Sequence, residues 1–227
     1  KWKQGKLTIT LGTHKLYAEK IQRNSDDFTV TLSWTGEYTF SEILELAGKT
    51  PLPPYLKRSA EESDKTNYQS VFAKFSGSVA APTASLHFNQ NLVENLKTKG
   101  VDIKTLVLHV GAGTFKPVST DDVTDHEMHA EEFTLSLTFV KDMLNLLKTN
   151  KNIIPVGTTA LRALESMYWT GCYLSQNPET DLNNFTLSQW YCYTASNDLS
   201  PIESFQTLKD YLQKHQLNHI QLKTQII

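Results

Sequence analysis

The sequence predicts an α/β protein, with a helix-covered, barrel-like sheet domain and, on its N-terminal side, a smaller all-β, barrel-like domain. The first forty residues alternate apolar and polar side chains, which is the two-residue period of β-strands. From about Val79 onward, predicted strands alternate with predicted helices, which is typical of a sheet covered by helices. We therefore expect part of the small domain in residues 1–50, a junction in 51–75 and the α/β domain in 76–227.

Strands and one helix are predicted in the first part. The strands are rich in Thr, Val, Ile and aromatic residues, and short turn sequences separate them. They cover residues 6–12, 14–21 and 28–34. A short helix follows over 40–48, with Ser41 as its N-cap and Gly48 as its end.

The segment 50–74 differs in composition and is predicted to separate the two parts. Its prolines, Pro51, Pro53 and Pro54, force an extended backbone, and a charged, polar stretch follows. Beyond it, helices are predicted over 89–100, 140–150, 158–169 and 202–217, and strands over 104–111, 133–139 and 152–157. In the first of these helices, the residues expected to face inward are Leu92, Val93 and Leu96.

The composition is that of an ordinary globular protein. The 227 residues carry a formal net charge of −2, so a nucleic-acid surface would have to be local. No apolar run reaches the roughly 20 residues that a membrane helix needs, and Cys172 and Cys192 are too few for a disulfide framework. We expect a cytoplasmic monomer with no membrane partner. Because the chain opens on Lys1 and stops on the apolar pair Ile226 and Ile227, we expect a piece of a longer protein that lacks the C-terminal part of the α/β domain.

A glycine loop follows the predicted strand 104–111. In HVGAGTFKPV, Gly111 and Gly113 resemble the start of a dinucleotide-binding loop, but Lys116 replaces the third glycine and Pro117 opposes a helix there. The dinucleotide interpretation therefore fails. Two interpretations stay open: a wall where the backbone approaches a ligand closely, or a tight structural turn.

Histidines and carboxylates gather in DHEMHAEE. His126 and His129 are three residues apart, whereas the zincin pattern places its histidines four apart on one helix face. The sequence therefore favours no metal. His126, His129 and Glu131 instead suit proton transfer or hydrogen bonds to a polar ligand, and a charged surface turn is the alternative.

Two further segments carry residues suited to a ligand. In PVGTTALRALES, Thr158 and Thr159 lie at a predicted helix N-terminus, with Arg162 one turn further on. In GSVAAPTASLHF, small residues let a ligand approach, and Phe88 could stack on a base. Ordinary helix capping and a packed turn explain these segments as well. All four segments fall at strand ends of one predicted domain, which is the pattern of a binding pocket.

Six segments across 51–166 resemble, in the same order, segments of the S-adenosylmethionine:tRNA ribosyltransferase-isomerases of queuosine biosynthesis. They are PLPPYLKR, YQSVFAK, GSVAAPTASLHF, LHVGAGTFKPV, HEMHAE and VGTTALRALES. The resemblance implies an enzyme, a transferase and isomerase, with S-adenosylmethionine as ribosyl donor and no metal. The implied acceptor is the pre-queuosine base 7-aminomethyl-7-deazaguanine at the wobble position of a tRNA with a GUN anticodon, and the products are epoxyqueuosine, adenine and methionine.

The resemblance also implies roles for residues in these segments. The sulfonium acidifies the neighbouring C5′ protons, so a base is needed, together with groups that bind the ribose and the methionine carboxylate. Expected in proton transfer or ribose binding are His126, His129 and Glu131. Expected to bind the nucleoside, the carboxylate or a tRNA phosphate are Thr83, His87, Phe88, Gly111, Gly113, Thr114, Phe115, Thr158, Thr159 and Arg162. Expected to contact tRNA are Tyr55, Lys57 and Arg58.

The chain departs from the family pattern at several points. Ser85 stands where glycine is expected, and Ala130 stands where serine is expected. An NNTR-type segment and a C-terminal NFH segment followed by PxST are not found in the sequence. Two alternatives stay open: a non-catalytic fragment or relative that binds nucleoside or tRNA, and a metal-dependent hydrolase built on His126 and His129.

Overall fold

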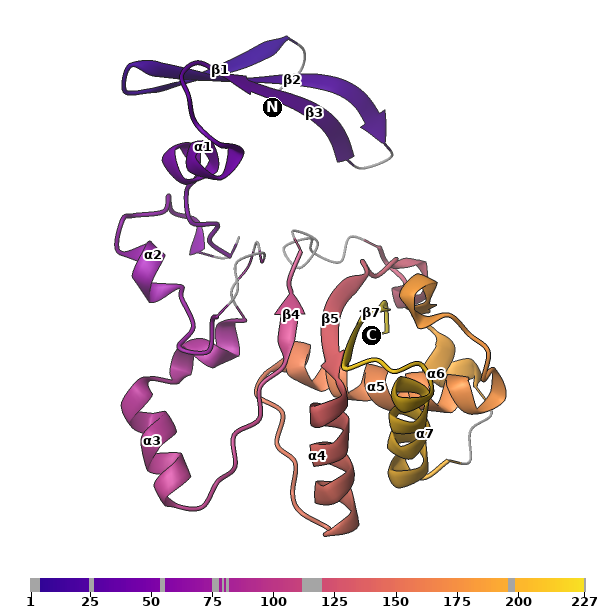
Figure 1. Cartoon of the computed structure of the whole chain (residues 1–227). Coiled ribbons are helices and arrows are strands. Elements are labelled where there is room, and N and C mark those ends of the chain that lie inside the picture. Colours follow the sequence, from indigo (N-terminus) through magenta and orange to yellow (C-terminus); the bar gives the residue numbers. More distant parts are fainter. Residues whose placement is uncertain are drawn as a thin grey trace. The chain divides into compact units, whose positions relative to one another are not determined.

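The computed structural model describes residues 5–24, 27–53, 56–74, 78, 80, 82–111, 120–195 and 199–226. The chain divides into two compact units, Lys1–Pro51 and Leu52–Ile227. The first contains a sheet of three strands and the second a sheet of four (Figure 1). This mixture of sheets and helices confirms the α/β class. The predicted barrel is not found in the described part of the chain, because both of its sheets are open.

An antiparallel sheet forms the smaller unit, as the alternation predicted. Its strands are β1 (Lys6–Leu11), β2 (His14–Asn24) and β3 (Asp27–Trp34), in the order β1-β2-β3. The register aligns Ile9, Leu16 and Trp34 across the three strands, so their side chains share one face. Leu16, on the central strand, is buried.

Helix α1 (Phe40–Ala47) completes the smaller unit at the predicted place. The helix contacts β1, and its Ile43 is fully buried. The predicted N-cap, Ser41, is wrong. Thr39 is the cap, because its hydroxyl accepts a hydrogen bond from the Glu42 amide while the Glu42 carboxylate accepts one from the Thr39 amide.

The larger unit combines a mixed sheet with helices. The strands are β4 (Val107–His109), β5 (Glu131–Ser136), β6 (Thr186–Leu187) and β7 (His219–Thr224). Their order is β4-β5-β7-β6, and only the β6–β7 pairing is parallel among these described strands. The helices are α2 (Asp64–Asn67), α3 (Gln90–Thr98), α4 (Leu137–Lys148), α5 (Thr158–Gln176), α6 (Tyr191–Thr194) and α7 (Pro201–Lys214). Short 3-10 helices are η2 (Thr83–His87), η4 (Val123–Asp125) and η5 (Leu182–Asn184).

Apolar side chains from β5, β7, α4, α5 and α7 form the core of the larger unit. Figure 1 shows β5 leading directly into α4, with α7 beside that helix. The prediction of one strand over 133–139 is therefore wrong at its end. The Ser136 hydroxyl accepts a hydrogen bond from the Phe139 amide, which starts α4 at Leu137.

The predicted strand over 152–157 is wrong. This segment is a loop between α4 and α5, and its Ile154 is 82% exposed. Its apolar residues imitate a strand pattern, but Pro155 has no amide hydrogen to donate to a ladder. Leu92, predicted to face inward, is exposed, and Val93 is the buried residue of α3.

Helix α5 approaches α7 closely at Gly171. A Cβ placed there would collide with the hydroxyl and carbonyl oxygens of Ser204. We expect Gly171→Ala to lower the free energy of unfolding by about 1–3 kcal/mol, although alanine is intrinsically the better helix former by about 1 kcal/mol. Chemical denaturation followed by circular dichroism measures this change. As a control, Glu165→Ala on the exposed face of α5 is expected to shift stability by less than about 0.5 kcal/mol; equal effects of the two substitutions would contradict the close approach.

Candidate functional site

The segment 126–130, here called the histidine segment, lies between η4 and β5 and leads into a chain of three polar side chains. His129 Nε2 lies 3.2 Å from Glu131 Oε1, and Glu131 Oε2 lies 3.2 Å from a terminal guanidinium nitrogen of Arg162. The side chains of Glu131 and Arg162 are 7% and 12% exposed, whereas that of His129 is 29% exposed. The carboxylate therefore joins a buried cation to an imidazole that reaches the surface.

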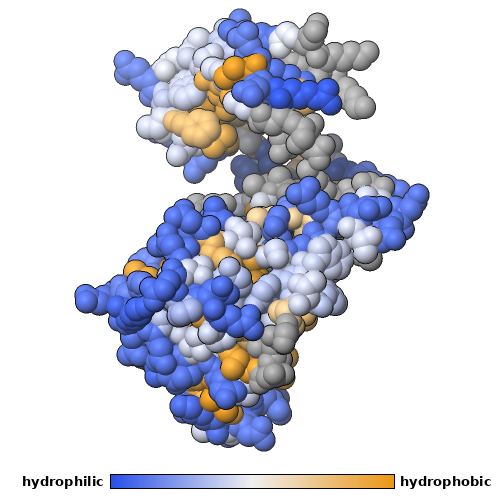
Figure 2. Space-filling view, turned by 90° about the vertical axis from the view of Figure 1, so that its right-hand side faces the viewer, coloured by the Kyte–Doolittle hydropathy of each residue, from blue (hydrophilic) through white to orange (hydrophobic). Residues whose placement is uncertain are grey.

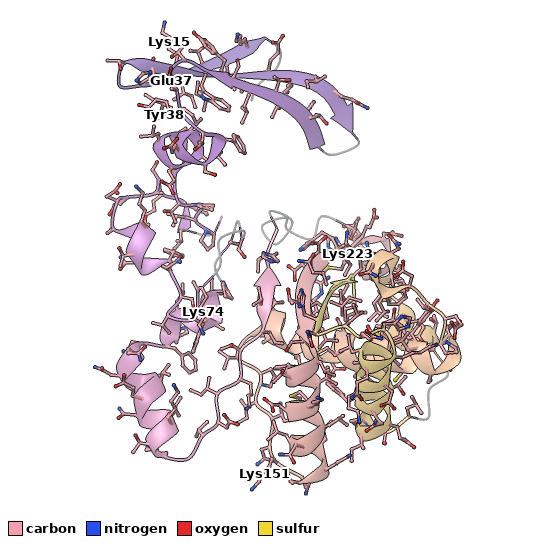
Figure 3. The ribbon with its side chains drawn as sticks, viewed as in Figure 1. Lys15, Glu37, Tyr38, Lys74, Lys151 and Lys223 are labelled. Carbon is pink, nitrogen blue, oxygen red and sulfur yellow. The ribbon has the colours of Figure 1, made fainter. Side chains whose placement is uncertain are left out.

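The register of the sheet explains why Glu131 faces α5. Glu131 pairs with Thr224 of β7, and the next pair along the strands is Glu132 with Lys223. Because side chains alternate across a sheet, the two pairs face opposite sides. Glu132 forms an ion pair of 3.0 Å with Lys223, which is labelled in Figure 3, while Glu131 meets Arg162.

Arg162 is held by several contacts within the protein. One terminal guanidinium nitrogen donates to the carbonyl oxygens of His129 and Thr224, at 3.1 and 3.0 Å. Ser166, one helical turn further on, donates to the Thr224 hydroxyl at 2.7 Å. Burial lowers the pKa of Arg162, and the Glu131 carboxylate opposes this shift. The predicted binding of a carboxylate or phosphate by Arg162 stays a prediction, since the guanidinium contacts that the structure shows are to the protein.

The start of the glycine loop, Val110 and Gly111, lies at the same end of the sheet as the histidine segment. Strand β4 runs antiparallel to β5, and His109 pairs with Glu132, so Val110 leaves β4 where the histidine segment enters β5. The Ser78 hydroxyl accepts from the Val110 amide at 3.2 Å, and the following Gly111 is half-buried. Outside the described residues lie four predicted site residues, Tyr55, Gly113, Thr114 and Phe115.

Residues 82–88, here called the small-residue segment, lie next to the start of α5. A Cβ at Gly157 would lie 2.9 Å from the Ala84 side chain, and Gly157 has a φ of 91°, so glycine is required there. The structure thus brings two of the predicted binding segments together. Their predicted binding residues that are exposed or half-buried include Thr83, His87, Thr158 and Thr159.

The end of the small-residue segment is packed within the chain. The ring centroids of Phe88 and Phe72 are 5.7 Å apart. Ser85, which stands where the family resemblance predicts glycine, is buried, and its hydroxyl donates to the Pro82 carbonyl at 2.7 Å. The larger side chain at position 85 is therefore accommodated with a hydrogen bond.

Lys57 and Arg58 are the predicted tRNA contacts that the structure describes. Lys57 is exposed. The two terminal nitrogens of Arg58 each lie 2.7 Å from a carboxylate oxygen of Asp64. The hydrogen bonds from Arg58, followed by one from the Glu61 amide, lower the pKa of Asp64 to about 2. The charge of Arg58 is therefore paired within the chain.

Acid is expected to remove the contribution of the Arg58–Asp64 pair to stability. Because folding lowers the pKa of Asp64, its stabilisation is present above the unfolded pKa of about 4 and is lost as the pH falls towards about 2. Urea unfolding of the original chain and of Asp64→Asn, from about pH 6 to about pH 2, measures this. The stability difference between the two proteins should shrink through this window, and a difference independent of pH would contradict the prediction.

The described residues contain no group of three or more His, Cys, Asp or Glu that could hold a metal ion. Among the described helices, none has both the length and the apolar character needed to cross a membrane.

An apolar groove between α4, α5 and α7 contains none of the predicted site residues. It is lined by Met143, Ile153, Leu164, Glu165, Tyr168, Pro201 and Phe205. The face in Figure 2 carries mostly hydrophilic side chains, with hydrophobic ones in small groups.

Several residues around the histidine segment were not predicted from sequence. They are Ser166, Gln189, Thr224 and Gln225. Ser166 had a detectable signal, because it lies four residues after Arg162 and therefore on the same face of α5. The other three lie between 58 and 97 residues along the chain from their partners, so no local pattern connects them.

The sequence of the chain is similar to a protein family and to several known proteins. A profile of the family described as queuosine biosynthesis protein matches residues 1–195. The S-adenosylmethionine:tRNA ribosyltransferase-isomerase of Sulfurihydrogenibium sp. is 48% identical over 151 residues, which are 63% of this chain and 45% of that protein. The protein of the same name from Pelodictyon phaeoclathratiforme is 50% identical over 130 residues, 57% of this chain and 38% of that protein.

A third relative of that name, from Francisella tularensis subsp. novicida, is 44% identical over 147 residues. The match covers 65% of this chain and 44% of the relative. The chain thus spans less than half the length of each of these three proteins. No solved structure matches the chain.

Proposed function

Because the chain belongs to the queuosine biosynthesis protein family, we propose that it transfers the ribosyl moiety of S-adenosylmethionine to a tRNA base and isomerises it. The proposed acceptor is 7-aminomethyl-7-deazaguanine at the wobble position of a tRNA with a GUN anticodon. The proposed products are epoxyqueuosine, adenine and methionine. The chain would act as a cytoplasmic monomer.

The contact chain from His129 through Glu131 to Arg162 carries the proposal. The reaction requires a base that removes a C5′ proton next to the sulfonium. With Nε2 hydrogen-bonded to Glu131, His129 would accept that proton on Nδ1, and the carboxylate would stabilise the imidazolium formed. Arg162 holds the Glu131 carboxylate in place for this role. His126, in the same segment, is the second candidate for proton transfer or ribose binding.

The neighbouring segments would bind the rest of the substrate. Contact between the small-residue segment and Gly157 supports a shared surface, on which Thr83, His87 and Phe88 would hold the nucleoside. The amides and hydroxyls of Thr158 and Thr159, at the N-terminus of α5, suit the methionine carboxylate or a tRNA phosphate, as does Arg162. The loop with Gly111, Gly113, Thr114 and Phe115 would form one wall, and Tyr55, Lys57 and Arg58 would contact tRNA.

We propose the finer fold in the same way. Residues 1–50 would belong to a small barrel-like domain, 51–75 to a junction, and 76–227 to a barrel-like catalytic domain. The short strands β4 and β6, of three and two residues, lie at the two edges of the described sheet, where a further strand would pair. The relatives contain residues outside the matched segment, and such residues would supply the additional strands of a barrel.

Released adenine tests the proposed function. The 227-residue chain is incubated with S-adenosylmethionine and tRNA bearing the aminomethyl base, and adenine and the modified base are followed by chromatography. Full-length protein from Sulfurihydrogenibium serves as the positive control. We expect adenine release that requires both substrates. Release by the control alone would overturn catalysis by this chain, and retained binding of either substrate would then favour the non-catalytic alternative, a module that binds nucleoside or tRNA.

A further inference from the structure

The backbone of the histidine segment is held by side chains from distant parts of the chain. The carbonyl oxygen of His126 accepts a hydrogen bond from Gln189 Nε2 at 2.6 Å, and the amide of Met128 donates to Gln189 Oε1 at 2.8 Å. Gln225 Nε2 donates to the Met128 carbonyl at 3.2 Å. Together with the Arg162 contact to the His129 carbonyl, these bonds fix the segment just before β5 begins.

Gln189 makes the pair of bonds that a neighbouring strand would otherwise make. It lies in the turn between β6 and α6 and is 8% exposed. A carboxamide carries a donor and an acceptor side by side, so one glutamine satisfies both the carbonyl of His126 and the amide of Met128. A carboxylate or an ammonium at this position would satisfy only one of them.

The bonds constrain the backbone and leave the histidine segment's own side chains available. Glu127 is exposed, His126 is half-buried, and the His129 side chain is 29% exposed. Reactive side chains commonly stand on a loop whose backbone a rigid scaffold fixes. The arrangement around Gln189 has this form, since the support comes from buried groups and the imidazoles remain accessible.

We infer that Gln189 is a positioning residue, which sets the placement of the His126 and His129 imidazoles through the backbone of the histidine segment. The inference rests on the proposed function in assigning proton transfer to these histidines. Misplacing a reacting group by about 1 Å costs on the order of 10²-fold in rate. Loss of the two Gln189 hydrogen bonds is therefore expected to lower turnover far more than substrate binding.

Two substitutions test the inference against a matched control. Gln189→Ala removes both bonds, while Gln189→Glu keeps an acceptor for the Met128 amide and loses the donor to His126. The control is Gln213→Ala, on the exposed surface of α7. Circular dichroism first establishes that each variant is folded. Hydrogen exchange of the Met128 amide and the imidazole resonances of His126 and His129 are then followed by NMR, and kcat and KM are measured from adenine release.

For Gln189→Ala we expect Met128 exchange to accelerate at least about tenfold, shifted imidazole resonances, and a kcat lower on the order of 10²-fold with KM within about twofold. Gln189→Glu should fall between this variant and the original chain. Unchanged exchange and resonances in Gln189→Ala, or equal changes in Gln213→Ala, would overturn the inference, as would equal losses in kcat and substrate affinity. If the original chain releases no adenine, the proposed function fails, and the NMR comparison still decides whether Gln189 positions the histidines.

Discussion

Arg162→Met is expected to lower the free energy of unfolding of the larger unit by about 3–5 kcal/mol. Methionine retains most of the length and apolar stem of arginine but removes the guanidinium that faces the Glu131 carboxylate, which is 7% exposed and keeps its contact with His129. Removing the cation of a buried ion pair is costly, and the carbonyl oxygens of His129 and Thr224 also lose a donor. Urea unfolding of the variant and the original chain gives the difference directly.

A double substitution separates the charge effect from lost packing. Glu131→Leu with Arg162→Met removes both charges, so it should be more stable than Arg162→Met alone. Lys141→Met, on the exposed side of α4, is the control and should change stability by less than about 0.5 kcal/mol. If the single and double variants were equally stable, the Glu131–Arg162 pair would not be the reason for the loss.

His129→Gln is expected to reduce kcat for adenine release by about 10²–10⁴-fold, the usual contribution of general acid–base catalysis. Glutamine preserves a hydrogen-bond donor towards Glu131, yet it has no basic nitrogen that accepts a proton. The prediction rests on the proposed function and is measured on the same chain and the same modified tRNA. Stability should change little, because the His129 side chain is already 29% exposed.

A second histidine provides the comparison for this loss. His219 begins β7 and is exposed, so His219→Gln changes the same residue type on the same sheet. Its kcat should stay within about twofold of the original value. A His129→Gln variant as active as His219→Gln would remove His129 from the proposed proton transfer and leave His126 as the candidate.

Local patterns predicted most of the elements of the fold. The alternation of apolar residues located β1 to β3, and helical spacing located α3, α5 and α7. Two strand predictions were wrong because a proline or a helix cap outweighed the apolar pattern. The apolar run 152–157 resembled a strand although Pro155 has no amide hydrogen to donate to a ladder, and the strand expected over 133–139 stops at Ser136, which caps the next helix.

The residues of the candidate site were likewise predicted only in part from the sequence. Sequence motifs identified His129, Glu131 and Arg162, but they gave no reason to pair a carboxylate with an arginine 31 residues later. That pairing follows from the register of β5 with β7 and from the face that α5 presents to them. Gln189 was missed because its hydrogen-bond partners lie 61 and 63 residues away in the chain, which no spacing rule describes.

Helix α5 connects the α7 interface with the candidate site. Gly171 and Thr158 are 13 residues apart on this helix, which separates them by about 20 Å. A tilt of about 4° at Gly171 would displace Thr158 by roughly 1.4 Å at that arm length. Such a displacement is large on the scale of catalytic placement. Under the proposed function, substitutions in the packing of α5 against α7 are therefore expected to alter turnover without touching a substrate.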